Sequence, residues 1–209
     1  MEQNRSAKII KLSVLCVLAV LMNIVTTIFF RDYLGLPLYI DTVFNAAAAF
    51  AAGLVPGIIV AVLSWLIPCI YYNHFNFYVL CSIAEVLLIC ALKPPEHLLQ
   101  KLSDSKEKII TTYTSLAAKL ILLYVVCAVA ISVLGGIINY VSDVFLDMHL
   151  RYYSVEDTFK LGLITSNLPA LAVNILSRIQ VNIVDRFIVI FGGYFISRGL
   201  TKLFLTPNS

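Results

Sequence analysis

The sequence predicts an all-α membrane protein: a bundle of about six transmembrane helices with an extracytoplasmic helical lid segment, forming a single domain over residues 1–209. Of the 209 residues, 60% are hydrophobic and 13% are charged, and the mean hydropathy is +0.92. A soluble domain is about half apolar and about one quarter charged. The excess lies in apolar runs of ~18 residues or more, a length typical of membrane spans. We therefore expect the lipid bilayer to surround most of the chain.

The expected spans follow these apolar runs along the chain. They cover residues 9–30, 38–52, 54–72, 75–92, 109–134 and 181–200. Basic residues precede the first span as in a signal peptide, but no small-x-small cleavage site follows it, so we interpret it as a retained helix. The second span is short, and Pro56 lies early in the third, where a helix tolerates proline. A charged loop at residues 93–108 separates the fourth span from the fifth.

Residues 139–180, between the last two spans, form a semi-polar segment. Ser154, followed three residues later by Asp157, is typical of a helix start. A structureless loop of this length is uncommon. We therefore expect this segment to form a helical lid that lies on the membrane surface or folds back into it.

Basic residues are distributed unevenly between the two sides of the predicted bundle. The side with both termini and the 93–108 loop carries nine: Arg5, Lys8, Lys11, Lys93, Lys101, Lys106, Lys108, Arg198 and Lys202. The other side carries four: Arg31, Arg151, Lys160 and Arg178. Because cytoplasmic loops are enriched in Lys and Arg, we expect a multi-pass protein of the cell membrane with both termini in the cytoplasm. The net charge of +3 is small and dispersed, so no nucleic-acid partner is expected.

No constellation of residues indicates catalysis or metal binding. The five cysteines lie in apolar segments without zinc or redox spacing, and the three histidines fall in separate loops. The sequence has no nucleophile elbow, no His-Glu-x-x-His helix and no phosphate-binding glycine loop. We therefore expect a protein without catalytic residues, cofactor or metal, which is not an enzyme. The pairs Gly135-Gly136 and Gly192-Gly193 indicate close helix contacts or kinks.

Polar side chains recur at helical spacing inside the apolar segments. They form three stripes: Asp41 with Asn45; Tyr78 with Ser82 and Glu85; and Asn174 with Arg178, Asn182 and Asp185 or Arg186, provided that the last helix begins early enough. Ionisable groups are costly in a bilayer and usually face a bundle interior, a partner or a cavity. Glu85 lies deeper than the others, at a depth similar to that of Lys119, and we expect these two to form a structural ion pair.

The remaining polar groups lie near the outer ends of their spans and are candidates for one outward-facing pocket. The candidate solute-binding residues are Asp41, Asn76, Tyr78, Asn139, Tyr140, Arg178, Asn182 and Asp185. Apolar walls with a few convergent polar groups suit a small organic solute. For each residue taken singly, the alternative is an interfacial cap or a hydrogen bond between helices.

Two stretches carry a resemblance to a known family. Residues 37–64, "PLYIDTVFNAAAAFAAGLVPGIIVAVLS", resemble the second and third helices of the substrate-binding (S) components of energy-coupling factor (ECF) transporters. Gly53 and Gly57 match the family's Gly-x-x-x-Gly-like turn. Residues 180–200, "QVNIVDRFIVIFGGYFISRGL", resemble the family's last helix, which opens with an asparagine and a charged pair; Asn182, Asp185 and Arg186 match them.

This resemblance implies a six-helix, high-affinity binder of a vitamin or another small organic micronutrient. It also implies docking through small residues on a transmembrane coupling (T) protein that carries two ABC ATPase subunits. The candidate docking residues are Ala19, Ala47, Ala48, Ala51, Ala52 and Gly53. The first span departs from the family, because Asn23 and not alanine stands four residues after Ala19. Cobalt and nickel members carry histidine where this chain has Glu2, which argues against those metals.

Three other functions remain open on the sequence. The chain could be a membrane sensor or scaffold that binds a ligand without transporting it. It could also be a purely structural membrane subunit or, with the least support, an intramembrane enzyme.

Overall fold

The computed structural model describes residues 2–34, 42–73, 75–95, 106–144, 160, 162–163 and 168–205. This part of the chain is helical almost throughout and contains no strand, which confirms the all-α prediction. Four of its helices are long and apolar enough to cross a membrane: Ser6–Phe30, Leu54–Tyr71, Ile110–Val144 and Ala170–Leu205. Two shorter apolar helices, Val43–Ala52 and Val79–Leu92, accompany them. These lengths and compositions indicate a helical membrane protein.

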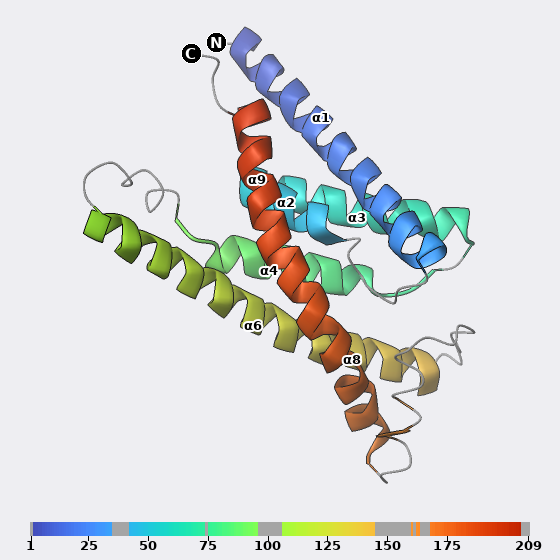
Figure 1. Cartoon of the computed structure of the whole chain (residues 1–209). Coiled ribbons are helices and arrows are strands. Elements are labelled where there is room, and N and C mark those ends of the chain that lie inside the picture. The colour runs from blue at the N-terminus through green and yellow to red at the C-terminus, as the bar shows by residue number, and fades with distance from the viewer. Residues whose placement is uncertain are drawn as a thin grey trace.

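The order of the helices along the chain can be followed in Figure 1. The elements are α1 (Glu2–Thr27), η1 (Ile28–Tyr33), α2 (Val43–Ala52), α3 (Leu54–Tyr71), α4 (Val79–Leu92), α6 (Lys106–Val144), α8 (Ala170–Phe187), η3 (Ile188–Gly192), α9 (Gly193–Leu200) and η4 (Thr201–Leu205). The last four form one continuous helical run, in which η3 and η4 are π-helical. This run crosses α6, and its end η4 packs against α1 (Figure 1).

Two predicted boundaries around residues 139–180 are wrong. Helix α6 continues past residue 134 to Val144, and the last helical run begins at Ala170 and not at residue 181. Four of the polar residues that interrupt the hydropathy there are buried inside the bundle, so they do not end the helices: Asn139, Asn174, Ser177 and Arg178. Most of residues 145–169 lie outside the described residues, and the helical lid stays a prediction.

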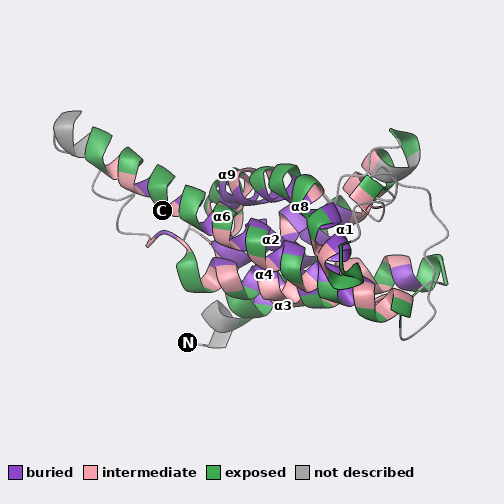
Figure 2. Ribbon diagram, turned by 90° about the horizontal axis from the view of Figure 1, so that it is seen from below, coloured by how far each residue is buried: buried purple, intermediate pink, exposed green. Residues whose placement is uncertain are grey.

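The helices differ strongly in length. With 10 and 14 residues, α2 and α4 extend over only ~15 and ~21 Å, less than the ~30 Å of a hydrocarbon core. Helix α6 has 39 residues and extends over ~58 Å. The six predicted spans are therefore four long helices and two short ones. Buried positions gather along the middle of the bundle, where α2 and α4 lie (Figure 2).

Four of the alanines of α2 form a ridge that lies inside the bundle. Residues Ala46, Ala47, Ala48 and Ala49 are fully buried, and α2 packs against α1, α3, α4 and α9. A Cβ atom on Gly193 of α9 would lie 2.8 Å from Ala46 Cβ and 3.1 Å from the Val43 carbonyl oxygen. The small side chains therefore let the backbones of α2 and α9 approach each other directly.

A second close approach joins α2 to α3. A Cβ atom on Gly57 would lie 3.0 Å from Ala49 Cβ and 2.8 Å from Val86 Cγ1 of α4. Gly53, which connects α2 to α3, has a φ of 91°, a value that favours glycine. The chain therefore turns at Gly53, whereas Gly57 lies within α3.

The burial of this ridge corrects the prediction for three of the six candidate docking residues. Ala19, Ala47 and Ala48 are 3%, 0% and 0% exposed, because α1, α2 and α3 pack together around them. They cannot form a docking surface in this structure. Ala51, Ala52 and Gly53 are half-buried, and docking through them stays a prediction.

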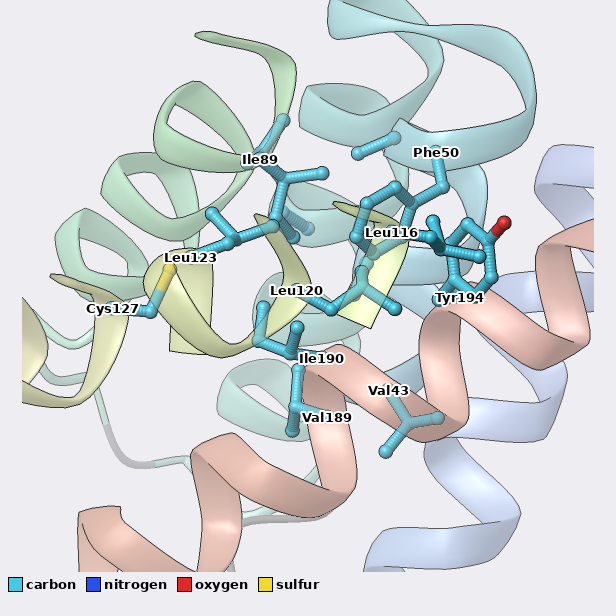
Figure 3. Close-up of a cluster of buried hydrophobic side chains, with 14 residues drawn as sticks. Val43, Phe50, Ile89, Leu116, Leu120, Leu123, Cys127, Val189, Ile190 and Tyr194 are labelled. Carbon is cyan, nitrogen blue, oxygen red and sulfur yellow. The ribbon is translucent and has the colours of Figure 1, made fainter. Parts of the chain in front are cut away.

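The main apolar core joins α2 and α4 to α6 and to η3 and α9 of the last helical run (Figure 3). Its labelled members in the figure are Val43, Phe50, Ile89, Leu116, Leu120, Leu123, Cys127, Val189, Ile190 and Tyr194. Phe50 and Tyr194 meet edge to face, with their ring centroids 5.6 Å apart. Because lipid is as apolar as leucine, this core stabilises the bundle through packing more than through the hydrophobic effect.

A buried polar network ties α1 to the start of α2. Asn23 Nδ2 donates to Asn45 Oδ1 at 2.8 Å and to Ser64 Oγ at 2.9 Å, and the Phe44 backbone N–H donates to Asn23 Oδ1 at 3.1 Å. Thr42, which directly precedes α2, makes no capping hydrogen bond. Asn23 therefore caps α2 from a neighbouring helix, which explains why a polar residue stands four positions after Ala19.

We expect Gly193→Ala to destabilise the protein by about 1–3 kcal/mol, because the new methyl group would overlap Ala46 and the backbone of α2. At about 2–4 °C per kcal/mol, thermal unfolding of the purified protein should show a lowered Tm. Gly199→Ala is the matched control, because it lies in the same helix with nothing within 4 Å of the added Cβ. An equal loss of Tm in both variants would contradict the close contact.

We expect Asn23→Leu to destabilise the protein by about 1–3 kcal/mol, because it leaves the Phe44 N–H and the Asn45 side chain buried without their partner. Adding Asn45→Leu to this variant removes one of those stranded groups. The double variant should therefore lose less Tm than the sum of the two single variants. Strict additivity in the thermal unfolding measurement would show that the two asparagines do not interact.

Candidate functional site

A stripe of polar side chains runs along the inner face of α8. Its buried members are Asn174, Ser177, Arg178, Asn182, Asp185 and Arg186. They share one face because they recur every three or four residues within a single helix. The sequence predicted this stripe on the condition that the last helix begins before Asn174. Helix α8 begins at Ala170, so the condition is met. The stripe faces α4 and α6, and side chains of those helices join it in layers.

The first layer consists of Tyr78, Asn139 and Arg178, and is called the Arg178 layer below. Arg178 Nη2 donates to the hydroxyl of Tyr78, and this hydroxyl donates to Asn139 Oδ1. The guanidinium carbon also lies 4.4 Å from the centroid of the Tyr78 ring, a cation–π contact. Tyr78 directly precedes α4, and Asn139 lies close to the end of α6. Three helices thus contribute one residue each.

A second contact, deeper in the bundle, joins α8 to α6. Asn182 Nδ2 donates to Ser132 Oγ at 3.1 Å, and Ser132 donates in turn to the Ala128 carbonyl oxygen at 2.7 Å. Both side chains are buried. This contact lies one helical turn along α8 from Arg178 and two turns along α6 from Asn139.

The deepest layer consists of Glu85, Asp185 and Arg186, and is called the Arg186 layer below. Arg186 Nη1 lies 2.5 Å from Glu85 Oε1, and the two side chains are 4% and 0% exposed. Asp185 is also fully buried. Glu85 and Arg186 therefore pair in the interior, where a charge must be paired and hydrogen-bonded to be tolerated.

The predicted pairing of Glu85 with Lys119 is wrong. The described partner of Glu85 is Arg186, while Lys119 lies half-exposed on α6. The prediction matched the depths of the two residues but had no information on which side of α6 faces α4. That inward side carries Leu116, Leu120 and Leu123. Arginine also suits a buried pair better than lysine, because its planar guanidinium is more weakly hydrated.

The layers stack because the three helices are in register. Tyr78 and Glu85 on α4 are seven residues apart, and Arg178 and Arg186 on α8 are eight apart, so each pair is separated by about 10–12 Å along its helix. These pairings require α4 and α8 to run in the same direction, with α6 antiparallel to both.

The other predicted solute-binding residues do not join the Arg178 layer. Asn76 Oδ1 accepts from Trp65 Nε1 and from the Tyr78 backbone N–H, both at 3.1 Å, so its oxygen ties α3 to the start of α4. Asn182 lies in the deeper contact with Ser132, and Asp185 is fully buried beyond it on α8. Tyr140 is half-buried beside Asn139. Asp41 lies outside the described residues.

Sequence reasoning missed Ser132 and the role of Gly135 in the site. A Cβ atom on Gly135 would lie 3.0 Å from Arg178 Cδ and 3.1 Å from Arg178 Nη1, so this glycine makes room for the Arg178 side chain. The spacing of Ser132, Gly135 and Asn139 places all three on one face of a helix. This pattern was hidden because the predicted fifth span ended at residue 134.

An apolar groove of about 220 Å³ lies between α6 and α8, next to the polar stripe. It is lined by Tyr124, Val125, Ala128, Val129, Ser132, Val133, Ile175, Ile179 and Ile183. Ser132 belongs to both features, because its hydroxyl also accepts the hydrogen bond from Asn182. Val125 and Val129 are exposed, so the groove opens at the surface of the bundle.

Comparisons of the chain with protein-family models, with curated proteins and with solved structures find no match in any of the three. The resemblance to ECF S components therefore depends on the two sequence stretches alone.

We expect Glu85→Gln to destabilise the protein by about 3–5 kcal/mol, because it leaves the buried Arg186 guanidinium without its carboxylate. Replacing both residues by Met should recover most of this loss, since neither charge is then buried. Lys119→Met is the control and should change the free energy of unfolding by less than about 0.5 kcal/mol. If thermal unfolding showed Lys119→Met to be as damaging as Glu85→Gln, Lys119 would have to be the partner of Glu85.

Proposed function

We propose that the chain is the membrane-embedded, high-affinity solute-binding subunit of an ECF-type importer for a vitamin or another small organic micronutrient. The observation that carries this proposal is the Arg178 layer, in which three helices bring an arginine, a tyrosine and an asparagine together inside an apolar bundle. Convergent polar groups with apolar surroundings are typical of sites for small organic molecules.

The contrast between the two parts of the bundle supports a role in binding. Helices α2, α3 and α9 associate through glycine and alanine contacts at Gly57 and Gly193. Helices α4, α6 and α8 instead bury two arginines and two carboxylates. Small-residue packing holds membrane helices together without burying charge, and ionisable groups in a membrane usually mark a functional site. Helix association alone therefore does not account for the polar stripe.

The proposed mechanism divides the work between this chain and its partners. The solute binds at the Arg178 layer from outside, in the orientation in which both termini lie in the cytoplasm. A T protein and two ABC ATPase subunits supply the energy for transport. Because α2 buries most of its alanine ridge, docking on the T protein uses the half-buried end of α2 at Ala51, Ala52 and Gly53.

We expect at least one member of a panel of water-soluble vitamins to raise the Tm of the full chain in lipid nanodiscs. A solute at 100 times its Kd stabilises the native state by about 2.7 kcal/mol, which corresponds to a shift of about 5 °C or more. Tyr78→Phe should reduce this shift, because it removes the hydroxyl that joins Arg178 to Asn139. Tyr113→Phe is the matched control, since Tyr113 is exposed on α6.

Two outcomes would contradict the proposal. If no solute stabilises the chain, and Arg178→Ala and Tyr78→Phe leave cellular uptake of every panel member unchanged, the chain is not a solute-binding subunit. If a solute binds but no T protein or ATPase co-purifies and uptake is absent, the chain binds without transporting, as a membrane sensor does.

A further inference from the structure

The apolar groove between α6 and α8 lies between two contacts that join these helices. At one end the backbones touch, because a Cβ atom on Gly136 would lie 2.6 Å from the Ile175 Cα atom. At the other end Tyr124 of α6 meets Phe187 of α8 edge to face, with the ring centroids 5.9 Å apart. A backbone contact holds helices closer together than a contact between two large rings does. The groove of about 220 Å³ occupies the space that opens between them.

The lining of the groove suits hydrocarbon and not a charged ligand. Among the described residues that line it, all are uncharged, and only Tyr124 and Ser132 carry a polar side-chain atom. The Ser132 hydroxyl already donates to the Ala128 carbonyl oxygen and accepts from Asn182. An apolar space with so few polar partners does not hold ordered water.

The groove is continuous with the surface of the bundle that faces the bilayer. Val125 and Val129 on its α6 wall are 48% and 60% exposed, and Ile179 and Ile183 on its α8 wall are 37% and 47% exposed. Both helices belong to apolar runs that are long enough to cross a membrane, and the lining residues lie inside these runs and not at their ends. Lipid tails therefore surround the opening of the groove.

The length of the groove matches one leaflet of a bilayer. Its α6 wall extends over ~14 Å from Tyr124 to Val133, and its α8 wall over ~12 Å from Ile175 to Ile183. One leaflet supplies about half of the ~30 Å hydrocarbon core. A partner helix with its side chains is ~10–12 Å across, so it would rest on the rim of the groove without filling it. A single acyl chain is narrow enough to lie along the whole groove.

From these observations we propose that the groove is a binding site for the acyl chain of a membrane lipid. The chain comes from the leaflet on the side of the Arg178 layer, because the α8 wall lies in the first half of its membrane-spanning run, as Arg178 does. It gives the groove walls the packing partners that they otherwise lack, and it covers Ser132 and its hydrogen bond to Asn182. This site does not depend on the proposed solute-binding function.

The test uses the full chain in lipid nanodiscs that contain phosphatidylcholine with a diazirine near the middle of one acyl chain. After irradiation, peptide mass spectrometry maps the residues to which the lipid is attached. We expect labelling of the groove walls to exceed that of the exposed face of α1 around Val17 by at least about fivefold, a preference of about 1 kcal/mol. Exposure alone would give equal labelling, because Val17 and Val129 are 58% and 60% exposed.

Variants that fill the groove should displace the acyl chain. Val129→Trp places a large ring at the α6 wall and should lower the labelling of the α8 wall by at least about fivefold. Ile183→Trp fills the groove from α8 and should lower the labelling of the α6 wall. Val17→Trp is the matched control, because it makes the same change at the same exposure on a helix that does not line the groove. It should leave the labelling of the groove unchanged.

A second lipid tests whether the acyl chain or the headgroup is recognised. Phosphatidylglycerol with the same diazirine should label the groove as strongly as phosphatidylcholine, because none of the described lining residues is charged. A difference of more than about tenfold between the two lipids would overturn the inference, since the headgroup would then decide binding.

Three further outcomes would overturn the inference and leave the solute-binding proposal standing. The first is equal labelling of α1 and the groove, and the second is the same labelling in Val129→Trp and Val17→Trp. The third is a dimer in native mass spectrometry that Val129→Trp dissociates, because a second copy would then occupy the groove. A panel vitamin that displaces the lipid label would also overturn it, since the groove would then belong to the solute. Failure of every vitamin to bind contradicts the solute-binding proposal and does not change the labelling expected here.

Discussion

The close approach of α9 and α3 to α2 is the constraint from which the rest of the arrangement follows. Helix α2 has only 10 residues and is enclosed by its neighbours, so lipid does not cover it. Gly193 and Gly57 bring the flanking backbones against Ala46 and Ala49, and Asn23 completes the hydrogen bonding at the start of α2. Because packing and hydrogen bonds drive helix association in a bilayer, these contacts set the positions of α3 and α9. Helices α4 and α6 are then positioned through the core that they share with α2, η3 and α9, and α8 is continuous with η3.

The polar stripe can exist in an apolar bundle because Arg186, at its deep end, is paired with Glu85. Removing one partner of a buried ion pair costs several kcal/mol, whereas an apolar pair of similar volume often stabilises a protein as well or better. The presence of the Glu85–Arg186 pair is therefore weak evidence that the pair stabilises the fold. It does link α4 to α8 at one depth, and this link fixes the register that brings Tyr78 beside Arg178 two turns away. The ion pair thus acts on the Arg178 layer through helix register.

From the sequence, the depth of a polar side chain in the bundle was predicted well. The side of the helix that faces a given neighbour was predicted poorly. Periodicity identified the stripes on α4 and α8, because spacing within one helix fixes which residues share a face. It failed for Lys119, since equal depth on two helices does not establish that their side chains face each other. It failed at the end of α6 for another reason, because Asn139 lowers the local hydropathy even though its side chain points into the bundle. For the alanines of α2, a smooth ridge could face a partner protein or another helix, and only the structure distinguishes these two cases.

The two buried arginines of α8 show why burial alone does not identify a binding residue. Arg186 and Arg178 lie eight residues apart on the same face, and both are almost fully buried. Arg186 forms an ion pair with Glu85 of α4, so its charge is neutralised within the fold. Arg178 meets the ring and the hydroxyl of Tyr78, and it lies in the layer nearest the start of α4 and the end of α6. A group near the start of α4 and the end of α6 can be reached by a solute at a smaller cost than an ion pair in the deep interior. Depth therefore distinguishes the two arginines where burial does not.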